Sequence, residues 1–222
     1  LNNNMRCFEI FSSLPNTIPE QYIVRVYQDI VTSKKRDVIA FDLDGTLLDS
    51  RKRHMRLLSK LLADEGILLD VSDLIDYKAQ GKSNIDYLIS KGLSTDFALD
   101  IQKKWVLHIE DLNYLSDDFL YPDAIELLNL YSNYDCILIT ARSNKNNVYY
   151  QLKQLGIDGY FVKVFVVNSP NVSEKKSKIL LENGAKLFIG DTKSDYIAAS
   201  KANIKYVHHK NGFHLESYVY SK

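Results

Sequence analysis

The sequence contains little cysteine and no long uninterrupted apolar run. Its 222 residues include two cysteines, Cys7 and Cys136, which excludes a fold held together by several disulfides. Cys136 opens an apolar run, so we expect it to be a buried thiol rather than half of a disulfide. The apolar stretch at residues 160–167 is interrupted by Lys163 and is too short for a membrane-spanning helix. We therefore expect no membrane partner.

An excess of charge of either sign is also absent. The 28 basic residues (Lys and Arg) equal the 28 acidic ones (Asp and Glu), so no overall field favours nucleic acid, and we expect no such partner. Residues 1–6 lack the apolar core of a secretory signal, which makes the cytoplasm the expected location. Residues 1–35 predict an N-terminal helical extension, in which Pro19 opens an amphipathic helix.

A short apolar strand that ends in two carboxylates is the most informative segment. Residues 38–41 are apolar and are followed by Asp42, Leu43, Asp44, Gly45 and Thr46. Side chains two positions apart in an extended segment point the same way, so Asp42 and Asp44 should converge where parallel sheets bind ligands. Close carboxylates repel each other unless a cation lies beside them, and Mg²⁺ prefers such oxygen ligands. Taken alone, the segment is a moderately specific signal, since solvated Asp-Leu-Asp-Gly turns are common in proteins.

The pattern after this strand predicts two kinds of structure. Residues 49–118 carry helical periodicity, including a helix over 96–113, and contain no strand pattern. Strands and helices alternate from residue 119 onward, which predicts a parallel sheet with helices on both faces. We therefore expect an α/β core of residues 36–48 and 119–222, with a small all-helical domain of residues 49–118 inserted into it. Trp105 is expected in the apolar core of that insertion.

The predicted strand 136–139 ends at a second polar site, Thr140, Ala141 and Arg142. The Thr140 hydroxyl and the backbone amides around Ala141 could bind phosphoryl oxygens. Arg142 could reach a phosphate or a substrate carboxylate, or could equally stabilise its own loop.

The predicted strand 186–189 ends at a third polar site, with Asp191 after the strand and Asp195 on the first turn of the next helix. Both carboxylates could hold a cation. A lysine should also neutralise the charge of a transferring group. We choose Lys176, at the start of the preceding helix, and keep its neighbour Lys175 as the alternative.

Phosphoryl transfer through a carboxylate is a chemistry that these residue types could perform. It requires a nucleophilic oxygen in line with the leaving group, which Asp42 could supply from the end of its strand. Asp44 could give a proton to the leaving oxygen and later take one from water.

The order Asp42-Leu43-Asp44-Gly45-Thr46, Thr140, Lys176 and Gly190-Asp191 with Asp195 resembles the four motifs of the haloacid dehalogenase superfamily, of the phosphoglycolate-phosphatase-like kind. The resemblance covers residues 37–207 and implies a Rossmann-like core with a mobile helical cap inserted after the first motif. It implies that Asp42 is the nucleophile, Asp44 the general acid and base, and Thr140 and Lys176 the phosphoryl ligands. It further implies that Asp42, the Asp44 backbone carbonyl and Asp191 hold Mg²⁺, with Asp195 ligating it directly or through water.

Within the resemblance, the second aspartate at position 44 favours phosphate-ester hydrolysis over dehalogenation. We therefore expect a Mg²⁺-dependent phosphatase that acts on a small phosphorylated metabolite through an aspartyl-phosphate. A phosphotransferase or phosphomutase of the same superfamily and a non-hydrolytic phospho-acceptor module remain alternatives. His208 and His209 follow the last predicted strand without a third ligand nearby, so we expect surface histidines rather than a metal pair.

Overall fold

The computed structural model describes residues 36–168 and 170–209. All of them except Arg36 belong to one compact unit. The predicted helix after Pro19 and the residue Cys7 lie outside the described residues. Within them, no helix combines the length and the apolar character needed to cross a lipid bilayer.

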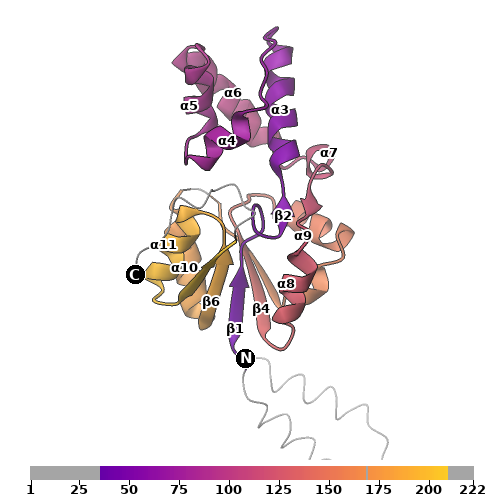
Figure 1. The fold of residues 1–222 in the computed structure, drawn as a ribbon, viewed down its shortest axis with the longest axis vertical. Helices are drawn as coiled ribbons and strands as arrows, with labels where there is room; N and C mark the ends of the chain where they lie inside the picture. The colour runs from indigo at the N-terminus through magenta and orange to yellow at the C-terminus, as the bar shows by residue number, and fades with distance from the viewer. Residues whose placement is uncertain (1–35, 169, 210–222) are drawn as a thin grey trace, which may run out of the picture. The chain divides into compact units, whose positions relative to one another are not determined.

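A parallel sheet of five strands forms the centre of this unit (Figure 1), which confirms the predicted fold class. The strand order is β5-β4-β1-β6-β7, so β1 lies in the middle, between the two strands that carry the other polar sites. The strands are β1 (Val38–Phe41), β4 (Asp135–Thr140), β5 (Lys163–Val166), β6 (Ala185–Gly190) and β7 (Lys205–His208).

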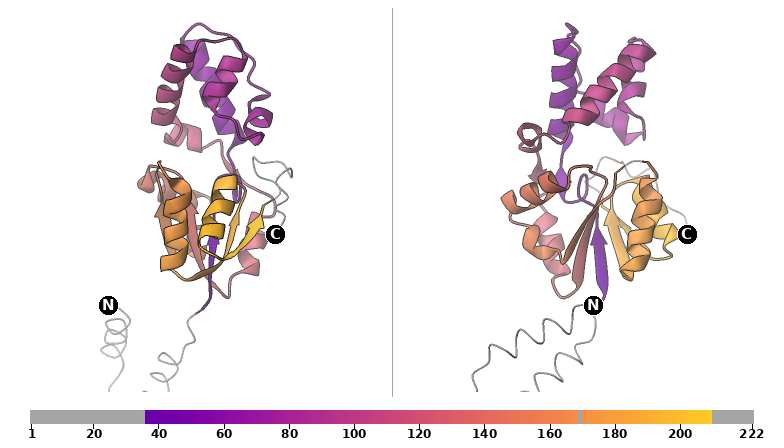
Figure 2. Two further views of the ribbon diagram at one scale, coloured as in Figure 1. Left: turned by 90° about the vertical axis from the view of Figure 1, so that its left-hand side faces the viewer. Right: turned by 180° about the vertical axis from the view of Figure 1, so that it is seen from behind.

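Both faces of the sheet are buried, because alternate residues of each strand enter different hydrophobic clusters. On β1, Ile39 and Phe41 belong to one cluster, and Val38 and Ala40 belong to the other. In the described part of the chain, two helices pack on each face (Figures 1 and 2). The first face carries α8 (Ala124–Leu130) and α9 (Lys145–Gln154), with the short 3₁₀ helix η1 (Asp158–Tyr160) after α9, and the second carries α10 (Val172–Glu182) and α11 (Lys193–Lys201).

Five helices beyond the carboxyl ends of the strands form what we call the helical module, residues 50–118 (Figure 1). They are α3 (Arg51–Asp64), α4 (Leu74–Ala79), α5 (Asn84–Ser90), α6 (Thr95–His108) and α7 (Leu112–Leu115). The module has its own hydrophobic cluster, against which Trp105 packs partly buried. It is joined to the sheet domain by a two-stranded antiparallel ribbon of β2 (Leu48–Asp49) and β3 (Phe119–Leu120). The division into domains at residues 49 and 119 stays a prediction. The two strands of the ribbon lie at these residues.

Two local expectations differ from the structure. The helix predicted over 96–113 ends at His108, and a turn precedes α7, because Asp111 has an extended backbone. His209 is buried rather than exposed, because its ring packs against that of Tyr121 at 5.4 Å and its Nε2 lies 3.2 Å from Asp123 Oδ2. Cys136 is a free, buried thiol, as expected.

Candidate active site

Asp42 directly follows the last residue of β1, and its backbone amide donates a hydrogen bond to the carbonyl of Ile189 on β6 at 2.8 Å. The side chain is almost completely buried. Lys176 Nζ donates to Asp42 Oδ1 at 2.5 Å and to Asp195 Oδ1 at 2.6 Å. Burial raises the pKa of Asp42 to about 7, although Lys176 acts in the opposite direction. The residue is thus held rigidly at the sheet edge beside a buried cation.

Asp195 is oriented by the helix that it begins. Thr192 is the N-cap of α11 and forms a capping box with Asp195: the Asp195 amide donates to Thr192 Oγ1 and the Thr192 amide donates to Asp195 Oδ2, both at 3.1 Å. The Thr192 hydroxyl also donates to Asp195 Oδ2 at 2.6 Å. The second carboxylate oxygen is thereby left to Lys176. Gly190 makes this arrangement compact, since a Cβ there would lie 2.8 Å from the Asp195 Cβ.

Asp191 lies over Gly45 in the turn after β1. Gly45 has a φ of +84°, and a Cβ at this position would lie 2.1 Å from Asp191 Oδ2. The Thr46 hydroxyl donates to Asp191 Oδ1 at 3.4 Å. Glycine is therefore required here both by the backbone conformation and by the close approach of the carboxylate.

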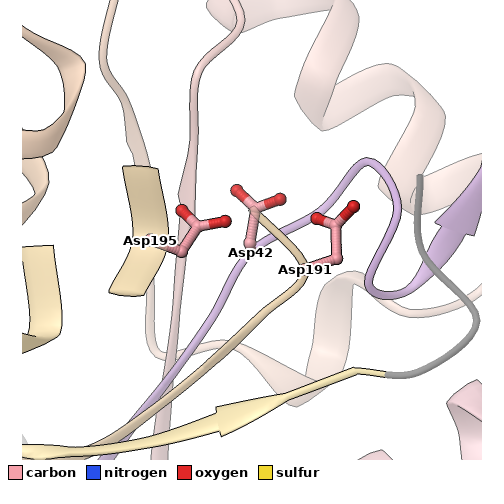
Figure 3. Close-up of side chains that lie close together, drawn as sticks. All are labelled: Asp42, Asp191 and Asp195. Atoms are coloured by element: carbon pink, nitrogen blue, oxygen red, sulfur yellow. The ribbon is translucent and has the colours of Figure 1, made fainter. Parts of the chain in front are cut away.

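Asp42, Asp191 and Asp195 form a group of carboxylates that could hold a metal ion (Figure 3). One oxygen from each lies within 4.8 Å of the others, and all three side chains are buried. Carboxylates this close repel one another unless positive charge lies among them, and three oxygen donors suit a hard cation such as Mg²⁺. The residues present therefore fit a divalent metal.

Asp44 lines the same cavity as Asp42 but contacts different side chains. Arg142 binds it in a bidentate manner, Nε to Oδ2 and Nη2 to Oδ1, both at 2.7 Å. Arg53 Nη2, from α3, donates to Asp44 Oδ1 at 2.6 Å. Burial acts to raise the pKa of Asp44, but the two guanidinium groups outweigh it and hold the pKa well below its ordinary value. In this arrangement Asp44 is an ionised carboxylate shared by an arginine of the helical module and one that follows β4.

Arg53 and Asp118 complete this cluster, and sequence reasoning missed both. The Asp118 carboxylate lies 3.1 Å from Arg53 Nε and 3.2 Å from Arg142 Nη2, and burial raises its pKa to about 6. Arg53 precedes Leu57 by four positions and so shares the buried face of α3. A charged residue on an apolar helical stripe is the signal that could have found it.

Thr140 is the last residue of β4, and Thr140, Ala141 and Arg142 all line the cavity above Asp42. The volume of this cavity is about 630 Å³. Its lining combines the sheet edge with residues of the helical module, so that it lies between the two. Arg142 is buried and its guanidinium pairs with Asp44 and Asp118.

Of the two candidate lysines, only Lys176 reaches the carboxylates. Lys175 is only partly exposed, and its Nζ donates to the backbone carbonyl of Asn168 at 2.6 Å. Neighbouring residues of a helix point about 100° apart, so that only one of the two can face the sheet edge.

Glu110 connects the helical module to the loop after β4, and it too was not predicted. Its Oε1 accepts hydrogen bonds from the backbone amide and hydroxyl of Ser143 at 2.8 and 2.9 Å. Its Oε2 accepts one from the amide of Asn144, the N-cap of α9, at 2.7 Å. A carboxylate at a helix N-terminus is stabilised by the unpaired amides there.

Comparisons with known proteins agree with this geometry. Residues 36–203 match a family model described as haloacid dehalogenase-like hydrolase. A comparison with curated proteins gave no match.

Several solved structures share the fold. A haloacid dehalogenase-like hydrolase from Streptococcus pneumoniae is 21% identical with a TM-score of 0.66, over 82% of this chain and 88% of that one. A predicted phosphoglycolate phosphatase from Haemophilus somnus is 20% identical with a TM-score of 0.63, over 82% and 89%. A predicted phosphatase from Clostridium acetobutylicum is 18% identical with a TM-score of 0.61, over 82% and 88%. At these identities the similarity shows a common fold.

Proposed function

The chain belongs to the haloacid dehalogenase-like hydrolase family, and from this premise we propose that it is a Mg²⁺-dependent phosphatase of a small phosphorylated metabolite. The observation that carries the proposal is the position of Asp42, on the floor of a cavity beside Lys176 and two further carboxylates. The names of solved structures with the same fold, which include predicted phosphatases, point to the same activity.

In the proposed reaction, a carboxylate oxygen of Asp42 attacks the phosphorus atom of the ester. The bond between phosphorus and the ester oxygen breaks, and an aspartyl-phosphate forms on Asp42. The leaving oxygen takes a proton from Asp44. Water then attacks the phosphorus atom and gives a proton to Asp44, and the bond between phosphorus and the Asp42 oxygen breaks. This step releases inorganic phosphate and restores both residues.

The phosphoryl group would be held by donors at the sheet edge. Lys176 would neutralise part of its charge, and Thr140 and the amide near Ala141 would donate to its oxygens. Asp42, Asp191 and Asp195, together with the predicted Asp44 backbone carbonyl, would hold Mg²⁺. The bound cation would offset negative charge on the transferring group.

The role of Asp44 requires its side chain to leave the two arginines. An Asp44 held between Arg53 and Arg142 is ionised and cannot donate a proton. Arg53 belongs to the helical module, whereas Arg142 belongs to the sheet domain. We infer that a movement of the module against the sheet withdraws Arg53 from Asp44. A rotation of the Asp44 side chain would then break its contact with Arg142, and the module in its closed position would exclude bulk water.

The test is the release of inorganic phosphate from an aryl phosphate and a panel of metabolite phosphates, with Mg²⁺ and with EDTA. We expect Asp42→Asn to abolish the release, and Asp64→Asn, a change at an exposed ion pair on α3, to leave it intact. Full activity of Asp42→Asn would contradict the proposal. A long-lived phosphoprotein without phosphate release would favour the phospho-acceptor alternative, and transfer to a second substrate molecule would favour a mutase.

A further inference from the structure

Two buried arginines hold the carboxylate of Asp44. The side chains of Arg53 and Arg142 are 3% and 5% exposed. Within the described residues, only Asp44 and Asp118 place a carboxylate within 4.0 Å of either guanidinium group. Two positive and two negative charges therefore balance in this cluster. A buried charge that loses its partner is costly, so the cluster needs another anion when Asp44 leaves.

Asp118 contacts the cluster from a fixed position. Its side chain is completely buried, and its Oδ2 accepts hydrogen bonds from Arg142 Nη2 at 3.2 Å and from Gln151 Nε2 at 2.9 Å. Gln151 Nε2 also donates to the carbonyl of Leu115 at 2.9 Å, which ties this part of the chain to α9. Asp118 directly precedes β3, where the helical module joins the sheet domain. A rotation of the module about the ribbon would displace a residue at this place little.

The second carboxylate oxygen of Asp118 can accept a further hydrogen bond. Oδ1 lies 3.1 Å from Arg53 Nε, but neither atom completes a hydrogen bond with a described residue. A buried donor and a buried acceptor thus lie within reach of each other but out of line. Leaving both without a partner is costly, and a rotation of the Arg53 guanidinium group would align them.

Both arginines also have neutral partners that do not depend on Asp44. Arg53 Nη1 donates to the backbone carbonyl of Ile109 at 3.2 Å. Arg142 Nη1 donates to Gln151 Oε1. These contacts can keep each guanidinium group in place while its carboxylate partner changes.

We propose that Asp118 is a positioning residue for the phosphatase reaction, which retains both arginines when Asp44 turns to the leaving group. The inference rests on the proposed phosphatase function and adds a residue to it. With Asp118 present, one carboxylate remains between the two guanidinium groups after Asp44 has left. Without Asp118, the same step would leave both buried guanidinium groups with no described carboxylate in contact, so Asp44 would stay bound to them.

The test compares two phosphate esters that differ in their need for a proton. An alkyl phosphate releases an alkoxide oxygen, which requires the proton from Asp44, whereas a dinitrophenyl phosphate releases a phenolate that is stable without one. The ratio kcat/KM reports the step in which the leaving group departs. Burial raises the pKa of Asp118 to about 6, so its carboxylate is charged in an assay at pH 8.

Asp118→Asn should lower kcat/KM for the alkyl ester about tenfold to hundredfold, which is part of the typical contribution of a general acid. The value for the dinitrophenyl ester should stay nearly unchanged. Asp44→Asn provides the reference, because it removes the proton donor itself and should show the same selectivity for the alkyl ester.

Three variants separate this role from a purely structural one. Asp118→Glu keeps the charge and should retain part of the alkyl rate. Asp117→Asn is the matched control, because it removes the neighbouring carboxylate, which pairs with Lys52 and Arg56, and should leave the ratio of the two esters unchanged. The double variant Asp118→Asn with Arg53→Met removes one charge of each sign. It should recover part of the alkyl rate lost in Asp118→Asn, which a role in packing alone would not allow.

An equal loss for both esters in Asp118→Asn, or no recovery in the double variant, would overturn the inference while leaving the phosphatase intact. If Asp118→Asn does not fold, Gln151→Leu decides, because it leaves every charge in place and removes the amide that holds Asp118. A selective loss for the alkyl ester in Gln151→Leu supports the inference, and an equal loss for both esters overturns it.

Absence of Asp42-dependent turnover of both esters would refute the phosphatase instead. Urea unfolding would then decide whether Asp118 and Asp44 share the arginines. Asp44→Asn should lower the urea midpoint more in the Asp118→Asn background than in the wild type, because the arginines then lose their last carboxylate. Equal shifts in the two backgrounds would overturn the sharing.

Discussion

Replacing Lys176 by methionine should weaken the folded state in a way that depends on both pH and Mg²⁺. The Lys176 side chain is 3% exposed and donates to two buried carboxylates, Asp42 and Asp195, at 2.5 and 2.6 Å. Methionine fills a similar volume but leaves the carboxylates without their cation. Removing one partner of a buried ion pair costs about 3–5 kcal/mol, which corresponds to a fall in Tm on the order of 10 °C for a chain of this size.

The sign of the pH dependence follows from the buried carboxylates. The pKa of Asp42 is already raised to about 7 in the folded protein, from an ordinary value of 3.8, and loss of Lys176 raises it further. A carboxyl group with a raised folded pKa contributes stability below its unfolded pKa and loses it as the pH rises through the folded value. In EDTA, the stability gap between the wild type and Lys176→Met should therefore be larger at pH 8 than at pH 5.

The assay is urea unfolding followed by circular dichroism, in EDTA and in excess Mg²⁺. A cation bound by the carboxylates at 100 times its Kd adds about 2.7 kcal/mol, so Mg²⁺ should restore part of the lost stability. Lys178→Met is the matched control, because Lys178 on the same helix is 76% exposed and should change stability by less than about 0.5 kcal/mol. Equal stability of Lys176→Met and wild type at pH 8 in EDTA, or a gap that does not narrow at pH 5, would refute the reasoning.

Two further predictions concern the turn after β1 and the contact between the domains. Gly45→Ala should lose both phosphatase activity and the rise in Tm caused by Mg²⁺, because the added Cβ would displace Asp191. Gly66→Ala is the control: Gly66 has a φ of +75° and no atom within 4 Å of an added Cβ, so this change should lower stability through backbone strain alone. Glu110→Gln should lower the unfolding free energy by about 1–2 kcal/mol and raise KM, because the charged acceptor of three hydrogen bonds is lost. An unchanged KM, or an equal loss of unfolding free energy in Asp111→Asn, would show that the contact of Glu110 with Ser143 and Asn144 has no specific role.

The elements that carry the proposed chemistry could be predicted because each lies where an apolar run stops. Residues 38–41 end at Asp42, the strand through residue 139 ends at Thr140, and the strand that reaches Gly190 is followed by Asp191. A parallel sheet brings such strand ends to one edge, so their meeting follows from topology alone.

The choice between Lys175 and Lys176 and the partners of Asp44 depend instead on packing. Which of two adjacent helical residues faces the sheet is set by the rotation of α10, and spacing in the chain does not determine it. Arg53 and Glu110 meet the sheet domain only through the orientation of the helical module, which no local pattern encodes. His209 was wrongly predicted to lie at the surface for the same reason, since Tyr121 and Asp123 are distant in sequence.

The ribbon of β2 and β3 has a consequence for how such a protein can diversify. The chain leaves and re-enters the sheet domain at two paired steps, Leu48 with Leu120 and Asp49 with Phe119. A different segment inserted in place of the helical module need only preserve these two residue pairs to leave the parallel sheet undisturbed. We expect that a helical segment from another protein, grafted between these pairs, would preserve the cleavage of the phosphate ester and change the substrate specificity.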